Sequence, residues 1–207
     1  MLGIKTACVQ AKTALCRHKE RDNAMKKTIL MVQGSLRKQS FNRQLQVAIT
    51  QALGDAVEVK ELDFGDLPFM NQDIEWPTPE SVQRVRNEFA AADGIWIVTP
   101  QYNASYPANI KNLIDWMSRP SAQGSSDKAT KDKKVTFSGI GGRTATLQMR
   151  TKLGELLPFV GMNPMDELGQ GYAVNGSAWG DNVVVFSDEQ KAAIQAQAEA
   201  FLKFIEA

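Results

Sequence analysis

Cysteine and histidine are almost absent from this chain of 207 residues, which has two cysteines and one histidine. All of them, Cys8, Cys16 and His18, lie before Met25. From Met25 onward the chain therefore offers no disulfide, no metal site built on cysteine or histidine, and no nucleophile paired with a histidine. We expect no bound metal.

Three further signals are missing. The chain has 24 basic and 23 acidic residues without a basic stripe, which excludes an electrostatic basis for binding nucleic acid or a membrane surface. Its longest apolar runs are a few residues, whereas a bilayer-spanning helix needs about 20. The glycine patterns of dinucleotide-binding and P-loop proteins are not found either. The chain does have enough apolar material, 43% of its residues, for one domain with a sizeable core.

Residues 1–24 differ from the rest of the chain. They carry five basic and two acidic residues, and Lys5 and Lys12 interrupt any apolar segment of a secretory signal. They are a disordered extension, a transit-like segment, or the product of a mis-set start with Met25 as the true initiator. We favour the first or the third, and therefore expect a cytoplasmic protein whose single domain spans residues 25–207.

From Met25 onward, short apolar strands alternate with amphipathic helices. Strands are expected at residues 27–32, 57–62, 94–98, 135–139 and 160–165. Helices are expected at residues 41–52, 79–89, 106–117, 144–157 and from Ser187 to the end. Such alternation predicts an α/β fold: a doubly wound, five-stranded parallel sheet between two layers of helices.

Several helix ends can be placed from their residues. Ser40 is the expected N-cap of the first helix, and Pro79 the first helical residue of the second. A capping box beginning at Ser187 opens the last helix, which should bury Ile194, Ala198, Phe201, Leu202 and Ile205. Trp116 has the spacing of a core residue, and the polar stretch 118–133 must be a surface loop.

The segment from Gly34 to Asn42 connects the first strand to the first helix. It holds two hydroxyls, a guanidinium and an amide at the start of a helix, from Ser35, Arg37, Ser40 and Asn42. Free N–H groups and partial positive charge at a helix N-terminus bind phosphate, and these side chains add donors in several directions. The same residues also fit an ordinary capped turn between a strand and a helix.

Two other segments follow strands of the same sheet. Pro100, Gln101, Tyr102 and Asn103 come after the third strand, and residues 138–142 end the fourth. Open parallel sheets bind ligands at the carboxyl ends of their strands. The pair Gly141 and Gly142 would let a planar ligand approach the backbone, or it simply serves the turn. Likewise, Tyr102 and Tyr106 flank a cleft, or they pack on the helix that contains Trp116.

Together these blocks resemble the NADPH-dependent FMN reductases, a family of flavodoxin-like fold that includes bacterial quinone, chromate and azo-dye reductases. The resemblance rests on Gly34–Asn42, on Val98–Asn103 with Pro107 and Lys111–Trp116, and on Ser138–Arg143. It implies that the loop of Ser35, Arg37, Ser40, Phe41 and Asn42 binds the phosphate of FMN. It also implies that residues 100–103 border the isoalloxazine ring and that Ser138, Gly141 and Gly142 approach its pyrimidine edge.

The function implied is an FMN-dependent oxidoreductase that takes electrons from NADPH or NADH and reduces quinones or other small soluble acceptors. A homodimer or homotetramer is implied too, with residues 73–76 forming a wall near the partner's site. No catalytic side chain can be selected from the sequence. The alternatives are a flavodoxin-type electron carrier without NAD(P)H activity and a phosphate-responsive module without flavin.

Three features depart from the family pattern. Gln101 stands where a glutamate is common, and Pro107 and Ala108 occupy a segment that usually contains a glycine. Glutamine is nearly isosteric with glutamate, so the shape of the loop should persist. The loop at 118–133 is also longer than usual, and we expect it to alter the mouth of the site.

Overall fold

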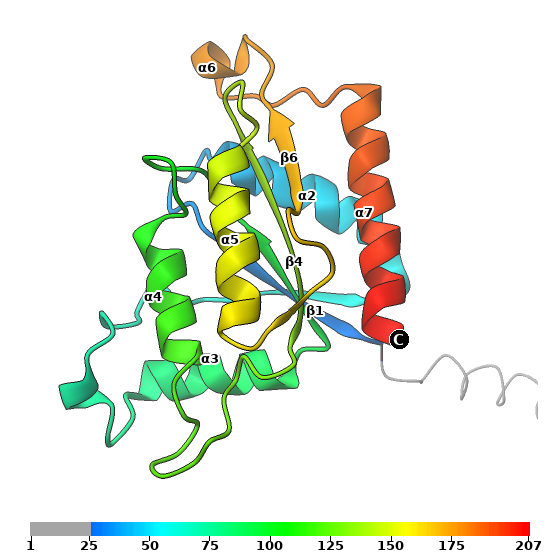
Figure 1. Cartoon of the computed structure of the whole chain (residues 1–207). Coiled ribbons are helices and arrows are strands. Elements are labelled where there is room, and N and C mark those ends of the chain that lie inside the picture. Colours follow the sequence, from blue (N-terminus) through cyan, green and yellow to red (C-terminus); the bar gives the residue numbers. More distant parts are fainter. Residues whose placement is uncertain (1–25) are drawn as a thin grey trace, which may run out of the picture.

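The structure is a computed structural model that describes residues 26–207, drawn in Figure 1. The prediction for residues 1–24, including their cysteines and their histidine, therefore lies outside the described residues. None of the described helices is long and apolar enough to cross a bilayer. Within the same residues, no three potential metal-binding side chains come together.

A parallel sheet forms the middle layer of the fold. Its strands run in the order β2-β1-β3-β4-β5, and β6 also pairs with β4. The strands are β1 (Thr28–Gln33), β2 (Glu58–Glu61), β3 (Gly94–Val98), β4 (Lys134–Gly141), β5 (Asn163–Pro164) and β6 (Gln170–Ala173). The order reverses direction at β1, which confirms the predicted doubly wound topology.

The fifth position of the sheet differs from the prediction, because two short strands share it. β5 pairs with the first residues of β4, and β6 pairs with its last four. Between them the chain turns away from the sheet at Asp166, whose carboxylate accepts hydrogen bonds from the backbone N–H groups of Leu168 and Gly169. Gly169 has a φ of 58°, which favours glycine. Because Tyr172 is the only buried residue of β6, no apolar pattern marked this strand in the sequence.

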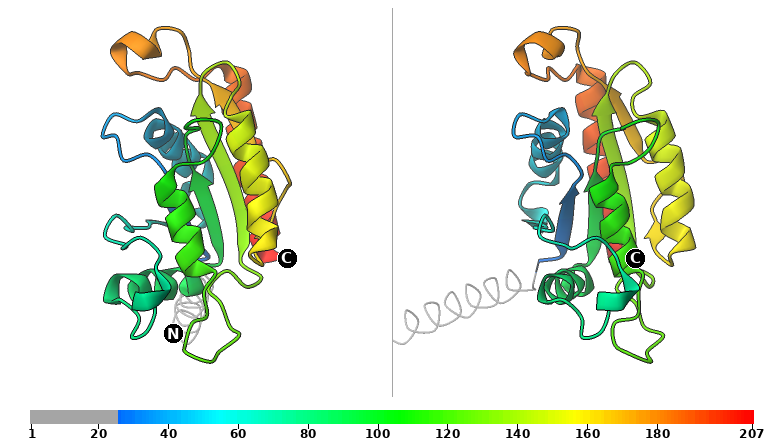
Figure 2. Two further views of the ribbon diagram at one scale, coloured as in Figure 1. Left: turned by 60° about the vertical axis from the view of Figure 1, so that its left-hand side comes forward. Right: turned by 90° about the vertical axis from the view of Figure 1, so that its left-hand side faces the viewer.

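Helices cover both faces of the sheet (Figures 1 and 2). α2 (Phe41–Leu53) and α7 (Asp188–Glu206) pack on one face, and α3 (Glu80–Ala91), α4 (Ala108–Met117) and α5 (Leu147–Phe159) pack on the other. Alternate strand residues serve the two cores: Ile29 and Met31 point toward α2 and α7, whereas Leu30 and Val32 point toward α3 and α4. Three short helices, η1 (Gly54–Ala56), η2 (Gln72–Ile74) and α6 (Ala178–Asp181), complete the fold.

Several helix ends confirm the predictions, and others correct them. Ser40 caps α2, and Ser187 opens α7 with a capping box. α3 begins at Glu80, so Pro79 is its N-cap and not its first helical residue. Similarly, α4 begins at Ala108 because Pro107 occupies its N-cap, which leaves Tyr106 outside the helix. These two helices therefore start one and two residues later than predicted.

Three further predictions can be compared with the structure. α5 starts at Leu147 and not at residue 144, because the preceding Ala145 and Thr146 have positive φ angles. In α7, Leu202 is only partly buried, unlike the other residues predicted for that face. Trp116 is fully buried, as predicted, and its indole N–H donates to the backbone oxygen of Pro68 at 2.8 Å.

The loop at 118–133 does not reach the mouth of the predicted site. It connects the end of α4 to the start of β4, at the lower edge of the sheet in Figure 1. The segments predicted to bind a ligand follow the carboxyl ends of β1, β3 and β4, at the opposite edge. The expectation that this loop alters the mouth of the site is therefore wrong.

Candidate active site

A cavity of about 410 Å³ lies at the carboxyl edge of the sheet. Cavities that bind small molecules commonly measure about 300–1,000 Å³. It is bordered by the loops that follow β1, β3 and β4 and by the segment that contains α6. Its lining residues are Ser35, Arg37, Ser40, Phe41, Asn42, Pro100, Gln101, Tyr102, Ile140, Gly141, Gly142, Thr144, Thr146, Trp179 and Asn182. We call it the site cavity.

The loop between β1 and α2 supplies donors to the site cavity. The Ser40 hydroxyl accepts a hydrogen bond from the N–H of Asn42 at 3.1 Å, and the N–H of Ser35 donates to the Gln33 side chain at 3.0 Å. Within residues 26–207, the N–H groups of Leu36, Arg37 and Lys38 donate to no protein acceptor. These three residues lie in the loop before α2, and of them only Arg37 lines the site cavity. Free backbone N–H groups in a loop that leads into a helix can bind an anion.

Arg37 gives the site cavity its charge. Among the described residues that line the site cavity, it is the only charged one. Its guanidinium lies 5.1 Å from the centre of the Phe41 ring and donates to the side-chain oxygen of Asn182 at 2.6 Å. One anionic group in this cavity would therefore meet the positive charge of Arg37 and the free backbone N–H of the same residue.

Asn42 has a structural role that the sequence did not predict. Its side-chain N–H donates to the backbone oxygen of Ile140, and its side-chain oxygen accepts from the backbone N–H of Ile140, both at 3.0 Å. β3 ends at Val98, opposite Ser138, so the Asn42 amide takes the place of a strand beside Ile140. Asn42 lines the site cavity, but both ends of its amide are engaged in holding α2 against β4.

The loop after β3 brings Pro100, Gln101 and Tyr102 to the site cavity. Tyr102 is about half exposed, and its backbone forms a two-way bridge with Ser105. Gln101 turns its side chain toward the start of α5, where it accepts from the N–H of Met149. Asn103 has a positive φ at the tip of this turn and does not line the cavity.

The end of β4 is open at Gly141 and Gly142. A Cβ added at Gly142 would meet no atom within 4 Å, and one at Gly141 would come within 3.3 Å of Thr146 alone. The glycines therefore leave backbone exposed to the site cavity. Ser138, in contrast, is fully buried; its hydroxyl donates to Gln197 at 2.8 Å and accepts from the Trp96 indole. It faces α7, so the structure does not bring this predicted residue to the cavity.

Sequence reasoning missed the residues that complete the site cavity, namely Ile140, Thr144, Thr146, Trp179 and Asn182. Ile140 belongs to β4 but lies one residue beyond the predicted strand at 135–139, and the two threonines follow it within the β4–α5 turn. Trp179 and Asn182 come from the segment between β6 and α7, which lacks any helical or strand periodicity. A tryptophan flanked by glycine, serine, aspartate and asparagine residues was the only available signal.

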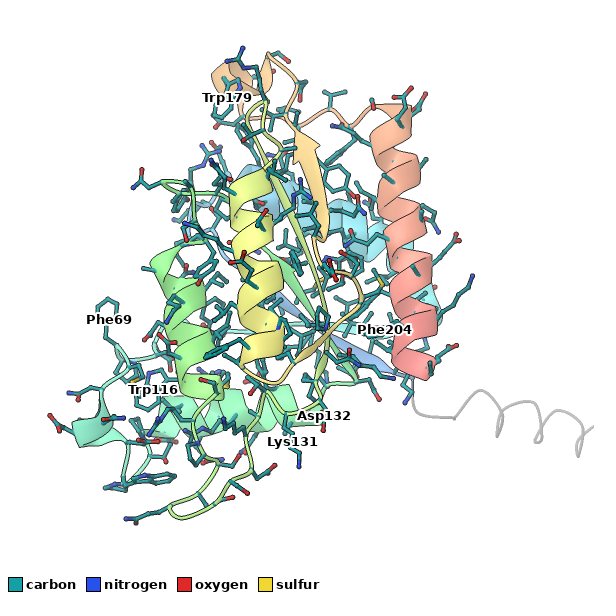
Figure 3. The ribbon with its side chains drawn as sticks, in the orientation of Figure 1. Phe69, Trp116, Lys131, Asp132, Trp179 and Phe204 are labelled. Carbon is teal, nitrogen blue, oxygen red and sulfur yellow. The ribbon has the colours of Figure 1, made fainter. Side chains whose placement is uncertain are left out.

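A second cavity of about 890 Å³ lies on the other side of the β1–α2 loop. Leu36 and Phe69 border it and are 79% and 81% exposed, and Figure 3 shows Phe69 projecting from the ribbon. Its wall also includes an ion pair in which Arg43 donates two hydrogen bonds to Glu61. These bonds lower the pKa of the Glu61 carboxyl.

The fold and the site cavity together define a flavodoxin-like α/β protein with a cavity beside the topological switch point, because the loops that border the cavity follow the carboxyl ends of β1, β3 and β4. Comparison with known proteins specifies the class. The family model for NADPH-dependent FMN reductases matches residues 27–173. This chain belongs to that family.

Individual relatives agree with this assignment. A quinone reductase of Pseudomonas putida is 32% identical over 180 residues, which cover 86% of this chain and 94% of that protein. A 2-hydroxy-1,4-benzoquinone reductase of a Burkholderia species is 42% identical over 95 residues, or 46% of this chain and 52% of that protein. The solved structure of FerB, a flavoenzyme NAD(P)H:(acceptor) oxidoreductase from Paracoccus denitrificans, has a TM-score of 0.77 and 30% identity. That match covers 87% of this chain and 97% of the other.

Proposed function

We propose that this protein is an FMN-dependent oxidoreductase that takes electrons from NADPH or NADH and passes them to quinones or similar small acceptors. The observation that carries the proposal is the single cation among the described residues that line the site cavity, Arg37, whose backbone N–H is also free, in the loop that leads into α2. The names of the matched quinone reductases supply the acceptor class.

The phosphate of FMN would bind at the β1–α2 loop. Ser35 and Ser40 offer hydroxyls, and Arg37 offers its charge together with its free backbone N–H. A dianion there is further favoured by the partial positive charge at the N-terminus of α2. Phe41 would support the guanidinium of Arg37 from below, in the cation–π contact already described.

The ring of FMN would lie between the loops after β3 and β4. Pro100 and Tyr102 border one side, and the exposed backbone of Gly141 and Gly142 borders the other. When bound, the flavin supplies the chemistry of hydride acceptance and electron release. The protein's contribution is then placement, since none of the described residues that line the site cavity is an aspartate, glutamate, lysine or histidine.

A flavodoxin-type carrier remains the second candidate, since the fold is shared. Carriers that dock on protein partners use strong electrostatic complementarity. From Met25 onward this chain has 19 basic and 21 acidic residues, which is nearly balanced. The charge therefore favours an enzyme that acts on small molecules.

The proposal includes a homodimer or homotetramer in the cytoplasm, formed by the domain at residues 25–207. Residues 73–76, around η2, would form a wall near the partner's flavin. In support, Ile74 and Phe69 are exposed apolar side chains on the same β2–α3 connection. Light scattering coupled to gel filtration would measure the oligomeric state, and a monomeric mass would contradict this part of the proposal.

A visible spectrum of the purified full chain tests the function. We expect the absorption bands of oxidised flavin, and bleaching when NADPH or NADH is added without oxygen. Adding a benzoquinone should then restore the oxidised spectrum. A coloured protein that neither nucleotide bleaches would be an electron carrier, and a protein that remains colourless and takes up no FMN would exclude both flavin functions.

A further inference from the structure

The segment between β6 and α7, residues 174–186, runs over the carboxyl edge of the sheet. It lies just beyond residues 27–173, which the family model matches. Figure 3 shows Trp179, in α6, at the end of the molecule toward which β6 points. Because Trp179 and Asn182 both line the site cavity, this segment adds a wall that the family model does not describe.

The backbone of the segment is anchored to α2 through Gln44. The Gln44 side-chain N–H donates to the backbone oxygen of Asn182 at 2.8 Å, and its side-chain oxygen accepts from the N–H of Val184 at 2.8 Å. Asn182 itself has a φ of 62°, a conformation that asparagine tolerates better than most residues. Its side chain is thereby presented to Arg37, to which it is hydrogen-bonded at 2.6 Å.

Two contacts then orient the Arg37 guanidinium. It lies over the Phe41 ring, and Trp179 meets the same ring edge-on, with centroids 5.3 Å apart and planes at 85°. The hydrogen bond to Asn182 uses one terminal nitrogen, Nη1. Within residues 26–207, Nε and Nη2 have no protein acceptor, so they remain available to an anion in the site cavity.

We propose that Asn182 is a positioning residue, which holds Arg37 toward the phosphate of FMN and thereby favours phosphorylated flavin over riboflavin. This inference rests on the proposed function, since it requires FMN with its phosphate at the β1–α2 loop. A long side chain loses conformational entropy when a ligand immobilises it. If the side chain is already ordered in the free protein, binding does not have to bear this entropic cost. Riboflavin has no phosphate and gains nothing from an oriented guanidinium.

Fluorescence titration of the full chain with FMN and with riboflavin tests this. Asn182→Gly removes the side chain and keeps the positive φ accessible; we expect its Kd for FMN to rise about 3- to 10-fold. Asn182→Asp keeps an acceptor for Arg37, but its carboxylate neutralises the charge of the guanidinium. The affinity for FMN should therefore fall at least as much as in Asn182→Gly. Riboflavin should bind both variants within about twofold of wild type, which also shows that they fold.

The matched control is Asn175→Ala. Asn175 lies in the same segment, where its side chain bonds to Ser177 and to the N–H of Val185 but not to Arg37. This variant should keep the wild-type ratio of FMN to riboflavin affinity. If Asn182 only holds the segment in place, one of two results is expected. Either Asn182→Asp will bind FMN with the wild-type affinity, or Asn182→Gly will lose affinity for FMN and for riboflavin by the same factor.

Either of those results overturns the inference. Tighter FMN binding in Asn182→Gly would also overturn it, because Asn182 would then compete with the phosphate for Arg37. In all these cases wild type binds FMN and the proposed function stands. A wild-type chain that binds neither flavin would instead overturn the proposed function together with this inference.

Discussion

The side-chain oxygen of Gln101 accepts a hydrogen bond from the backbone N–H of Met149 at 3.1 Å. Met149 lies in the first turn of α5, whose own N-cap residue, Thr146, makes no capping hydrogen bond. The side-chain N–H of Gln101 meanwhile donates to Gln148 at 3.1 Å. Gln101 therefore caps α5 from the loop after β3, and ties together the two loops that border the proposed position of the flavin ring.

This geometry predicts opposite results for two substitutions at Gln101. Gln101→Ala leaves the N–H of Met149 without its acceptor and should lower the free energy of unfolding by about 0.5–2 kcal/mol. Gln101→Glu keeps the acceptor and places a negative charge at a helix N-terminus, so it should be at least as stable as wild type. Urea denaturation at pH 7 measures both. Equal stability of wild type and Gln101→Ala would exclude the capping role.

Replacing Arg37 should weaken FMN binding. Arg37→Ala removes a charge-assisted hydrogen bond of about 1.5–3 kcal/mol, which corresponds to a rise in Kd of about 10- to 150-fold. Lys38→Ala is the matched control, because Lys38 is an exposed cation next in the chain that does not line the site cavity. Fluorescence titration should show little change for Lys38→Ala. An unchanged Kd for FMN in Arg37→Ala would contradict the proposal that the phosphate binds at this loop.

Asn42 should matter more for stability than for direct binding. Asn42→Ala leaves both backbone groups of the buried Ile140 unpaired, which should cost about 2–4 kcal/mol of unfolding free energy. Asn42→Asp has the same shape but turns an oxygen toward the Ile140 carbonyl, and we expect it to be no more stable than Asn42→Ala. Chemical denaturation of the three proteins tests this. A stable Asn42→Asp variant would show that one of the two bonds is dispensable.

The ion pair between Glu75 and Arg119 predicts a pH dependence of stability. Glu75 is 4% exposed and accepts two hydrogen bonds from Arg119, which lower the pKa of its carboxyl. Folding therefore favours the ionised form, and this stabilisation is present above the unfolded pKa near 4.5 and is lost as the pH falls through the lower folded value. Glu75→Gln should lose about 1.5–3 kcal/mol at pH 7 and approach wild type in acid.

The control for that experiment is Glu58→Gln. Glu58 pairs with Lys60 at 3.3 Å on the surface, where both side chains are more than half exposed. Such pairs contribute little to stability, so this variant should follow wild type across the pH range. Unfolding curves between pH 3 and pH 7 compare the three proteins. A constant difference between wild type and Glu75→Gln would mean that the Glu75 carboxyl is not the titrating group.

Local patterns in the sequence were sufficient for most of the fold. Buried strands such as β1 and β3 are continuous apolar runs, and serines at Ser40 and Ser187 mark helix starts, because capping depends on neighbouring residues alone. β6 escaped prediction because its position is decided by pairing with β4, and its residues have no apolar alternation of their own. β5 and β6 share the last position of the sheet because the chain turns away between them at Asp166, and the sequence gives no strong signal for this turn.

The sequence by itself determined the donors of the β1–α2 loop, the order of strands and helices, and the family to which the blocks belong, because each is encoded in contiguous residues. Only the tertiary structure decided where the polar side chains point. Ser138 and Asn42 stand in the predicted blocks, yet one is bound to Gln197 and the other to Ile140, residues distant in the chain. Asn182 and Arg37 are hydrogen-bonded although 145 positions separate them in the chain. Only the packing of distant segments brings such groups together, so the sequence pattern could not show this contact.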